Sequence, residues 1–298
     1  MAVMPTPCRA FAFLDIDHPI VAWEVYRGVL VSALARDKPP RCPVSMMFAS
    51  IIQHQDNVRF QNELLIEHIR QQHHPDQISR LTALYLFHDK HLAELALTWG
   101  AHFLPENLAE LEFHPVGHVS RLDSNWITNA PRDNKGQICR DDLSWISRYW
   151  SGEPYDGKPL WEMIGHGRAF VLGTTHRERA YGVCVREFPD ALDMLEVSRI
   201  CAAVGSDLGH TLAWITQPES GVFELKYYLD MRDANDPAFL QRLASYTGPK
   251  NWRDLAPGKE TFGVGDLRAY FRTFRISVDF GVNNILNSES IHHIGPAR

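Results

Sequence analysis

The sequence lacks the marks of a secreted, membrane-spanning or disulfide-bonded protein. Its five cysteines are scattered and include no Cys-x-x-Cys pair, which argues against a disulfide framework and against a zinc ribbon. No segment approaches the roughly 20 apolar residues that a membrane helix needs. Residues 1–12 also lack the basic region and the apolar stretch of a signal peptide. We therefore expect a cytoplasmic protein with no membrane partner.

Excess basic charge and metal-binding spacing are missing as well. The formal net charge is −6, which argues against a broad basic surface for nucleic acid and leaves room only for a local patch. The fifteen histidines form no HExxH motif, and no set of cysteines and histidines has zinc spacing. We therefore predict that the protein uses no metal.

The residues that are present are typical of a globular α+β protein. Of the 298 residues, 45% are hydrophobic and 22% are charged, which is enough for one large core or two ordinary ones. Strand and helix patterns follow one another without the regular βαβ rhythm of a parallel sheet. The expected strands cover residues 11–16, 81–87, 108–113 and 169–172, and the expected helices cover residues 62–71, 89–99 and 141–150. Residues 20–34 fit both periodicities.

The chain is expected to form two units, residues 1–173 and residues 174–298. The second unit is predicted to be a C-terminal α+β extension. Its expected elements are helices at residues 191–204 and 237–245, a strand at 222–231 and an aromatic segment at 270–280. The aromatic side chains suit either recognition of a target or inhibitor, or a core of this unit, and we favour the core.

The most informative pair of residues is Trp161-Glu162. It precedes the apolar run 169–172 and follows a segment rich in aromatic residues. A carboxylate that is fixed near a buried strand, beside an aromatic wall, suits an enzyme that stabilises a positively charged sugar intermediate. This predicts chemistry on a glycosidic bond. The alternative is a glutamate that only caps or solvates the edge of a core.

A longer pattern of spaced residues resembles a known family. It consists of Glu63, Glu67 and Arg70, the run from Pro75 to Leu81 that leads into Tyr85-Leu86-Phe87, Ala93, the run Tyr149-Trp150-Ser151-Gly152-Glu153, and Pro159-Leu160-Trp161-Glu162 with Gly167 and Val171. Over about residues 58–173 the chain is similar to a bacterial domain family of uncharacterised members that is grouped with ADP-ribosyltransferase-like folds.

The resemblance implies a fold, a substrate and a biological setting. The fold would be two split antiparallel sheets that grip NAD, and the activity would be transfer of ADP-ribose to a protein or nucleic acid target. Some related toxins belong to toxin–antitoxin or phage-defence systems, so the resemblance also implies an antitoxin or inhibitor protein as a partner.

Several residues receive roles in this interpretation. Glu162 is the predicted catalytic carboxylate, and Trp161 and Tyr85 would offer aromatic rings to NAD. Ser79 and Arg80 would present a hydroxyl and a guanidinium to its diphosphate or a ribose, although Arg80 could equally pair with Glu63 or Glu67. Tyr26-Arg27-Gly28 resembles the first-strand arginine element of many ADP-ribosyltransferases, which implies that Arg27 contacts NAD.

Two other functions remain as alternatives. Phe13-Leu14-Asp15-Ile16-Asp17 resembles the first motif of haloacid-dehalogenase-type phosphatases, in which the first Asp attacks phosphorus and the second acts as acid and base beside Mg²⁺. Here His18-Pro19 replaces the usual Gly-Thr, so a strand that ends in a polar turn is the simpler interpretation. The other alternative is a catalytically inactive interaction module.

Overall fold

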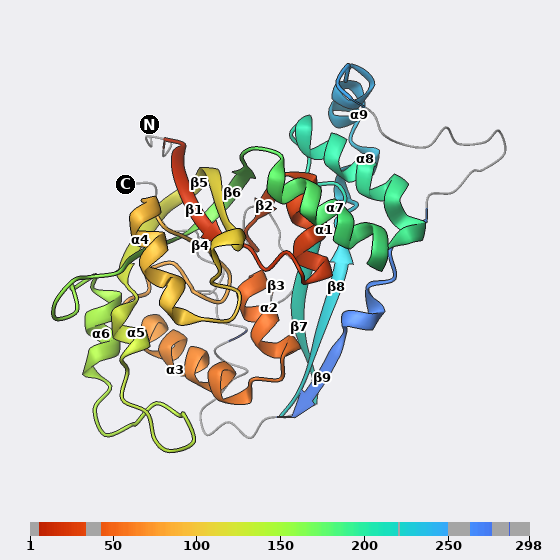
Figure 1. Cartoon of the computed structure of the whole chain (residues 1–298). Helices are drawn as coiled ribbons and strands as arrows, with labels where there is room; N and C mark the ends of the chain where they lie inside the picture. The colour runs from red at the N-terminus through yellow and green to blue at the C-terminus, as the bar shows by residue number, and fades with distance from the viewer. Residues whose placement is uncertain (1–5, 34–42, 220, 250–262, 276–285, 287–298) are drawn as a thin grey trace.

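The first sheet is built around two long antiparallel strands. The computed structural model describes residues 6–33, 43–219, 221–249, 263–275 and 286. At the centre of the sheet, β5 (Leu108–Asp123) pairs with β6 (Trp161–Val171). The other strands are β1 (Cys8–Phe13) beside β5, and β4 (Leu84–Leu86) and β2 (Val29–Val31) beside the first and second halves of β6. Figure 1 shows this sheet on the left of the molecule.

The second sheet is also antiparallel and takes its strands from both ends of the chain. Its order is β3 (Pro43–Val44), β7 (Thr211–Glu219), β8 (Val222–Leu229) and β9 (Arg272–Arg275). Because β3 follows shortly after β2 in the sequence, the N-terminal part of the chain contributes a strand to each sheet.

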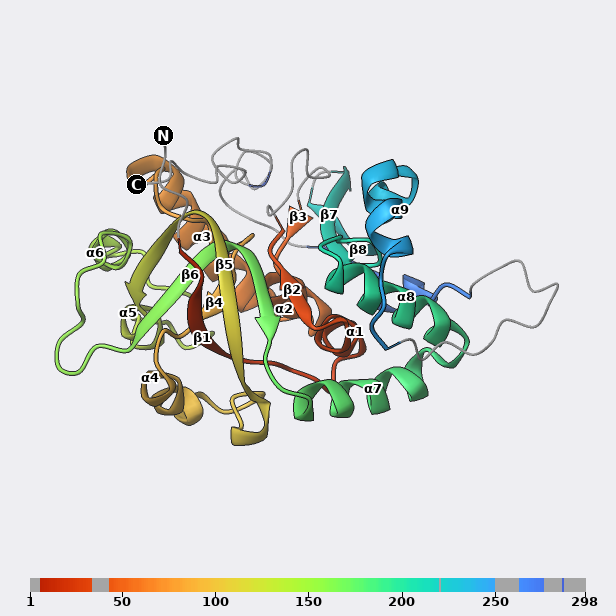
Figure 2. The same cartoon turned by 90° about the horizontal axis from the view of Figure 1, so that it is seen from above.

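Helices flank the sheets and fill the space between them. The α-helices are α1 (Pro19–Arg27), α2 (Met46–Gln53), α3 (Asn57–His73), α4 (Lys90–Leu95), α5 (Asn125–Thr128), α6 (Ser144–Trp150), α7 (Thr175–Glu187), α8 (Leu192–Ala203) and α9 (Pro237–Ala244). Short 3₁₀ helices cover Ala96–Trp99, Pro105–Asn107, Pro189–Ala191, Arg232–Asn235 and Leu267–Tyr270. Figures 1 and 2 show α2 between the two sheets, with α1, α7 and α8 together beside the second sheet. No helix in the described part of the chain has both the length and the apolar character needed to cross a membrane.

Local sequence signals explain where the helices around the site begin and end. Residues 20–34, which fit two periodicities, divide at Gly28, whose φ of 88° ends α1 in the left-handed conformation so that β2 can follow. Ser45 and Asp56 accept hydrogen bonds from backbone N–H groups in the first turns of α2 and α3. These caps fix the starting points of the two helices that face the first sheet.

The pairing of β5 and β6 is interrupted where Gly167 of β6 lies against the backbone of β5. The register shifts between Pro115 and Val119 of β5, opposite Gly167 of β6. A Cβ atom on Gly167 would lie 2.2 Å from the carbonyl oxygen of His114, and its φ is 149°. Only glycine fits here, so the irregular pairing of β5 with β6 depends on this residue.

One hydrophobic core joins the two predicted units. It contains residues of β1, α1, α2 and β5 together with residues of α7, α8, β7 and β8. Trp23 on α1 donates an indole hydrogen bond to the backbone oxygen of Gly209 at 2.9 Å, and Arg168 on β6 pairs with Asp207 at 2.6 Å. The proposed boundary near residue 173 therefore falls between β6 and α7 in sequence, but side chains pack across it.

Most predicted elements occur, with changed bounds. The α+β class with antiparallel sheets is confirmed. The predicted strand at 108–113 extends to Asp123, and the predicted strand at 169–172 is the end of β6. The aromatic side chains of the C-terminal part are mainly core residues, as Phe223 and Tyr227 are almost fully buried. The end of the predicted aromatic segment, residues 276–280, lies outside the described residues.

Candidate functional site

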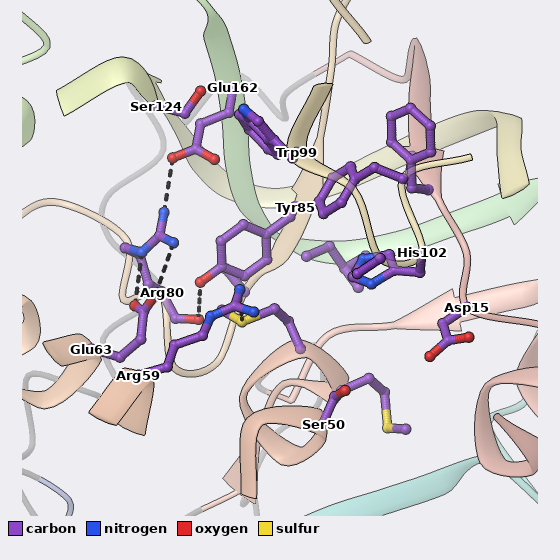
Figure 3. A pocket seen from close by; sticks show the side chains of 18 of the residues that line it. Asp15, Ser50, Arg59, Glu63, Arg80, Tyr85, Trp99, His102, Ser124 and Glu162 are labelled. Atoms are coloured by element: carbon purple, nitrogen blue, oxygen red, sulfur yellow. Dashed lines mark hydrogen bonds and ion pairs between the residues drawn. The ribbon is translucent and has the colours of Figure 1, made fainter. Parts of the chain in front are cut away.

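A large cavity lies between the first sheet and the helices that face it. Its volume is about 820 Å³, in the range of small-molecule binding sites. Its lining includes Arg59 and Glu63 of α3, Arg80 and Tyr85 around β4, and Glu162 of β6. Figure 3 shows Arg80 and Glu162 on one side of this pocket and Asp15 and His102 on the other, with Tyr85 between them.

Arg80 is the centre of a buried ionic cluster in the wall of the cavity. Its guanidinium binds both oxygens of Glu63, at 3.0 and 3.1 Å, as a bidentate pair. Its Nη1 also donates to Oε1 of Glu162 at 2.8 Å and to the hydroxyl of Tyr149 at 2.7 Å. The Arg80 side chain is thus committed to two carboxylates, which is the alternative role expected for it, and it positions Glu162.

Glu162 has one oxygen held by the protein and one directed to the cavity. Oε1 accepts hydrogen bonds from Arg80 and, at 2.8 Å, from the hydroxyl of Tyr149. Among the described residues no donor is within hydrogen-bond distance of Oε2, although the residue is only 6% exposed. Because neighbouring residues of a strand point to opposite faces, Trp161 faces away and packs against Arg121 instead.

The pKa values of the two carboxylates are shifted in opposite directions. Burial raises the pKa of Glu162, and the nearby Arg80 offsets this only in part. Burial would also raise the pKa of Glu63, but the Arg80 guanidinium and its hydrogen bonds bring it below the ordinary value. One cation therefore stabilises two acids unequally, and Glu162 is the carboxylate that more readily holds a proton.

Buried hydrogen bonds fix the segments that carry Arg80 and Glu162. Before Arg80, the hydroxyl of Ser79 donates to Glu67 at 2.9 Å, and Arg70 binds the backbone oxygens of Pro75 and Gln77. Before Glu162, the Asp123 carboxylate accepts backbone N–H bonds from residues 125, 155 and 160. Both segments are held by full sets of partners, as preorganised groups need to be.

The structure brings together only some of the residues predicted to contact NAD. Arg80 and Tyr85 line the cavity with Glu162, whereas Ser79 and Trp161 do not. Arg27 is buried at the end of α1, where its Nη1 binds Glu24 at 2.7 Å, and it is not part of the lining. Ser79, Trp161 and Arg27 are therefore not placed to contact a ligand in this cavity.

The two aspartates of the phosphatase alternative diverge. Asp15 lines the cavity, but Asp17 is 73% exposed at its side chain and pairs with Arg179 at 2.8 Å. Such a mechanism needs both carboxylates at one phosphorus atom. The geometry does not support this alternative.

Sequence reasoning missed two groups of cavity residues. Arg59 is exposed and lines the cavity, and its Nη2 lies 3.9 Å from the sulfur of Met47. Its charge acts on Glu63, but among the described residues it forms no ion pair with a carboxylate. The other group is Glu24 of α1, His210 just before β7, and Tyr227 of β8. No local motif marks these residues, because they meet only through the tertiary fold.

Comparison with known proteins gives a partial match. Residues 43–177 are similar to a family described as a protein of unknown function, DUF2441. This stretch is less than half of the chain. It contains Arg59, Glu63, Arg80, Tyr149 and Glu162, while α1, β7 and β8 lie outside it. No curated protein matches the chain significantly.

Proposed function

We propose that the protein is an NAD-dependent ADP-ribosyltransferase with an ADP-ribosyltransferase-like fold, and that Glu162 is its catalytic carboxylate. The observation that carries the proposal is the arrangement of Glu162, whose Oε1 is fixed by Arg80 and Tyr149 while Oε2 faces the cavity. A carboxylate oxygen that is held rigidly at a cavity wall stabilises developing positive charge without reorganising.

The reaction breaks the bond between the nicotinamide nitrogen and ribose C1. The bonding electron pair goes to the ring nitrogen, neutral nicotinamide leaves, and the ribose passes through an oxocarbenium-like state. An oxygen or nitrogen of the acceptor then bonds to C1 and releases its proton. Because the ionised form of Glu162 is the one that stabilises the cation, its raised pKa predicts that turnover falls on the acid side at a higher pH than for an ordinary glutamate.

Two other cavity residues suit the remaining parts of NAD. Arg59 rather than Arg80 is the group that binds the diphosphate, because the Arg59 guanidinium has no acidic partner among the described residues. The ring of Tyr85 lines the cavity, and its hydroxyl is fixed on the backbone oxygen of Arg80 at 2.6 Å, so the ring can stack on the nicotinamide.

The target and the setting are part of the same proposal. The acceptor is a protein or nucleic acid, and the activity is that of a cytoplasmic toxin in a toxin–antitoxin or phage-defence system, with an antitoxin or inhibitor protein as partner. The resemblance of residues 58–173 and the site support this assignment of target and setting. The acceptor is to be identified by experiment.

The decisive experiment compares Glu162→Gln with Glu153→Gln. The full chain is incubated with adenylate-labelled NAD and fractions of cell extract, and released nicotinamide and transferred label are measured. Loss of one preorganised charged contact costs on the order of 3 kcal/mol, so Glu162→Gln should lower turnover about a hundredfold. Glu153 is an exposed glutamate paired with Arg148, and the same change there should leave turnover unaltered.

Two results would contradict the proposal. One is the absence of NAD consumption by the wild-type protein with every fraction. The other is equal turnover by Glu162→Gln and the wild type. Circular dichroism and melting temperatures of all three proteins establish that any loss of turnover is not a loss of fold.

A further inference from the structure

The cavity has a second set of polar side chains that the proposed reaction does not use. His210 precedes β7, and Tyr227 lies on β8, in the second sheet. Both side chains line the cavity, with residue exposures of only 3% and 2%. His18, at the N-terminal end of α1, lines it as well. Polar groups in such surroundings normally have partners, so this set needs an explanation.

Glu24 fixes the orientation and the tautomer of His210. Oε2 of Glu24 lies 2.7 Å from Nδ1 of His210 and 2.7 Å from Nη1 of Arg27, while Oε1 accepts the backbone N–H of Thr211 at 2.6 Å. Burial would raise the pKa of Glu24, but His210 and Arg27 lower it to about 2. The carboxylate is therefore ionised and can only accept, so Nδ1 of His210 is the donor of this contact and Nε2 is the ring nitrogen left for a ligand.

Tyr227 and His18 supply the complementary donors. The Tyr227 hydroxyl and both ring nitrogens of His18 are buried and have no hydrogen-bond partner in the described part of the structure. Burial raises the pKa of Tyr227 and lowers the pKa of His18, so the hydroxyl keeps its proton and the imidazole is neutral. Leaving a buried polar group unpaired costs about 1–3 kcal/mol, which a bound ligand would recover.

Apolar side chains line the cavity beside these polar groups, together with the carboxylate of Asp15. Val21, one turn after His18 on α1, and Met46, at the start of α2, both line the cavity and pack on the core. A flat ring could lie against them while its edge meets one acceptor and two donors. Ligand sites commonly combine apolar walls with a few convergent polar groups in this way.

We propose that His210, Tyr227 and His18 form a subsite for a nucleobase that carries an exocyclic amine beside a ring nitrogen. The amine donates to Nε2 of His210, and ring nitrogens accept from the Tyr227 hydroxyl and the His18 ring. A base with a keto oxygen in place of the amine would put an acceptor against Nε2. The subsite therefore selects adenine over hypoxanthine.

The subsite lies well away from Glu162 along the first sheet. Arg168 is on β6 with Glu162 and pairs with Asp207, just before His210. At about 3.3 Å per strand residue, Glu162 and Arg168 are separated by roughly 20 Å. The base could thus be the far end of a dinucleotide whose other end lies at Glu162, which would rest on the proposed function. It could also belong to a separate nucleoside.

The test measures binding rather than turnover. Adenosine and inosine are titrated into the full chain by calorimetry, and adenosine should bind at least tenfold more tightly. In His210→Asn the side-chain amide can still donate to Glu24, but no acceptor occupies the place of Nε2. The affinity for adenosine should therefore fall to the affinity for inosine. His91→Asn, on the exposed surface of α4, should change neither affinity.

A second variant guards against loss of fold. Tyr227→Phe removes only a hydroxyl without a described partner, so it should not lower the melting temperature, but it should weaken binding of both nucleosides. Equal affinity of the wild type for adenosine and inosine would overturn the proposal, as would no binding of adenosine. Unaltered adenosine binding by Tyr227→Phe would overturn it as well.

Competition with NAD identifies the source of the base. If NAD displaces adenosine, the subsite holds the adenine end of the dinucleotide. If adenosine binds beside saturating NAD, the subsite holds a second ligand. Adenosine-selective binding by a protein that never releases nicotinamide would sink the proposed transferase function and leave the subsite standing.

Discussion

Replacing Arg80 with methionine should destabilise the fold strongly at neutral pH and much less in acid. The guanidinium makes four hydrogen bonds to Glu63, Glu162 and Tyr149, and the side chains of both ion pairs are 7% exposed or less. Its removal leaves two buried carboxylates without a cation. Breaking a buried pair in this way costs about 3–5 kcal/mol.

The pH dependence follows from the same geometry. Without the cation, burial raises the folded-state pKa of both Glu63 and Glu162 above the ordinary value of 4.5. When folding raises the pKa of a carboxyl group, its protonated form stabilises the folded state. This stability is present below the pKa of the unfolded state and is lost as pH rises through the pKa of the folded state. A tenfold difference in acid dissociation constant between the folded and unfolded states corresponds to about 1.4 kcal/mol. The loss of unfolding free energy in Arg80→Met at pH 7.5 should therefore shrink to about 1–2 kcal/mol near pH 4.5.

The assay is urea unfolding followed by tryptophan fluorescence at both pH values. Arg148→Met is the matched control, because Arg148 pairs with Glu153 at 2.9 Å but both side chains are about half exposed. That surface pair should contribute less than about 1 kcal/mol at either pH. The reasoning is refuted if Arg80→Met costs less than about 1 kcal/mol at pH 7.5, or if its deficit is the same at both pH values.

Three further changes test other parts of the structure. Arg59→Gln should raise the dissociation constant for NAD about tenfold in calorimetry and leave the melting temperature unchanged; unaltered NAD affinity would remove Arg59 from the binding role. Because the pKa of Glu24 is lowered to about 2, the stability it contributes is present above pH 4.5 and disappears as pH falls toward 2. The wild type should therefore lose about 3 kcal/mol more than Glu24→Gln over that range in acid titrations of unfolding, and parallel curves would contradict the pairing. Gly167→Ala should cost at least about 2 kcal/mol of stability, because the added Cβ would overlap the backbone at His114. Gly182→Ala, in the middle of α7 with open space around it, should be neutral or stabilising by about 0.5–1 kcal/mol in thermal melts. Similar melting temperatures for both variants would refute the steric argument.

Local patterns predicted the elements whose signals are contained in their own residues. The helices at α3 and α8 and the strand at β8 follow from apolar spacing and end signals within each segment. The predicted strand at 108–113 is shorter than β5, which continues through Pro115 and Gly117, residue types that commonly interrupt strands. In the structure these residues lie at the irregular pairing opposite Gly167, and the strand continues past them. A bulge that is set by the partner strand cannot be read from one strand alone.

The candidate site was predictable only in part, for the same reason. Glu162 and Arg80 were selected from sequence, and both line the cavity. Whether Arg80 would face a ligand or Glu63 depended on the position of α3, which sequence spacing does not define. Trp161 was expected to share the site with its neighbour, but β6 begins at Trp161, and strand alternation sends the two side chains to opposite faces. His210 and Tyr227 join the cavity through packing of the second sheet alone.

The short strand β3 has a consequence for how such a protein could change over evolutionary time. Residues 43 and 44 come from the N-terminal part of the chain, yet they pair with β7 in a sheet whose other strands follow residue 210. A gene fusion, deletion or shuffling event with a breakpoint near codon 173 would separate β3 from the strand it borders and expose the edge of β7. Such a break should therefore be tolerated only where another segment covers the exposed edge of β7.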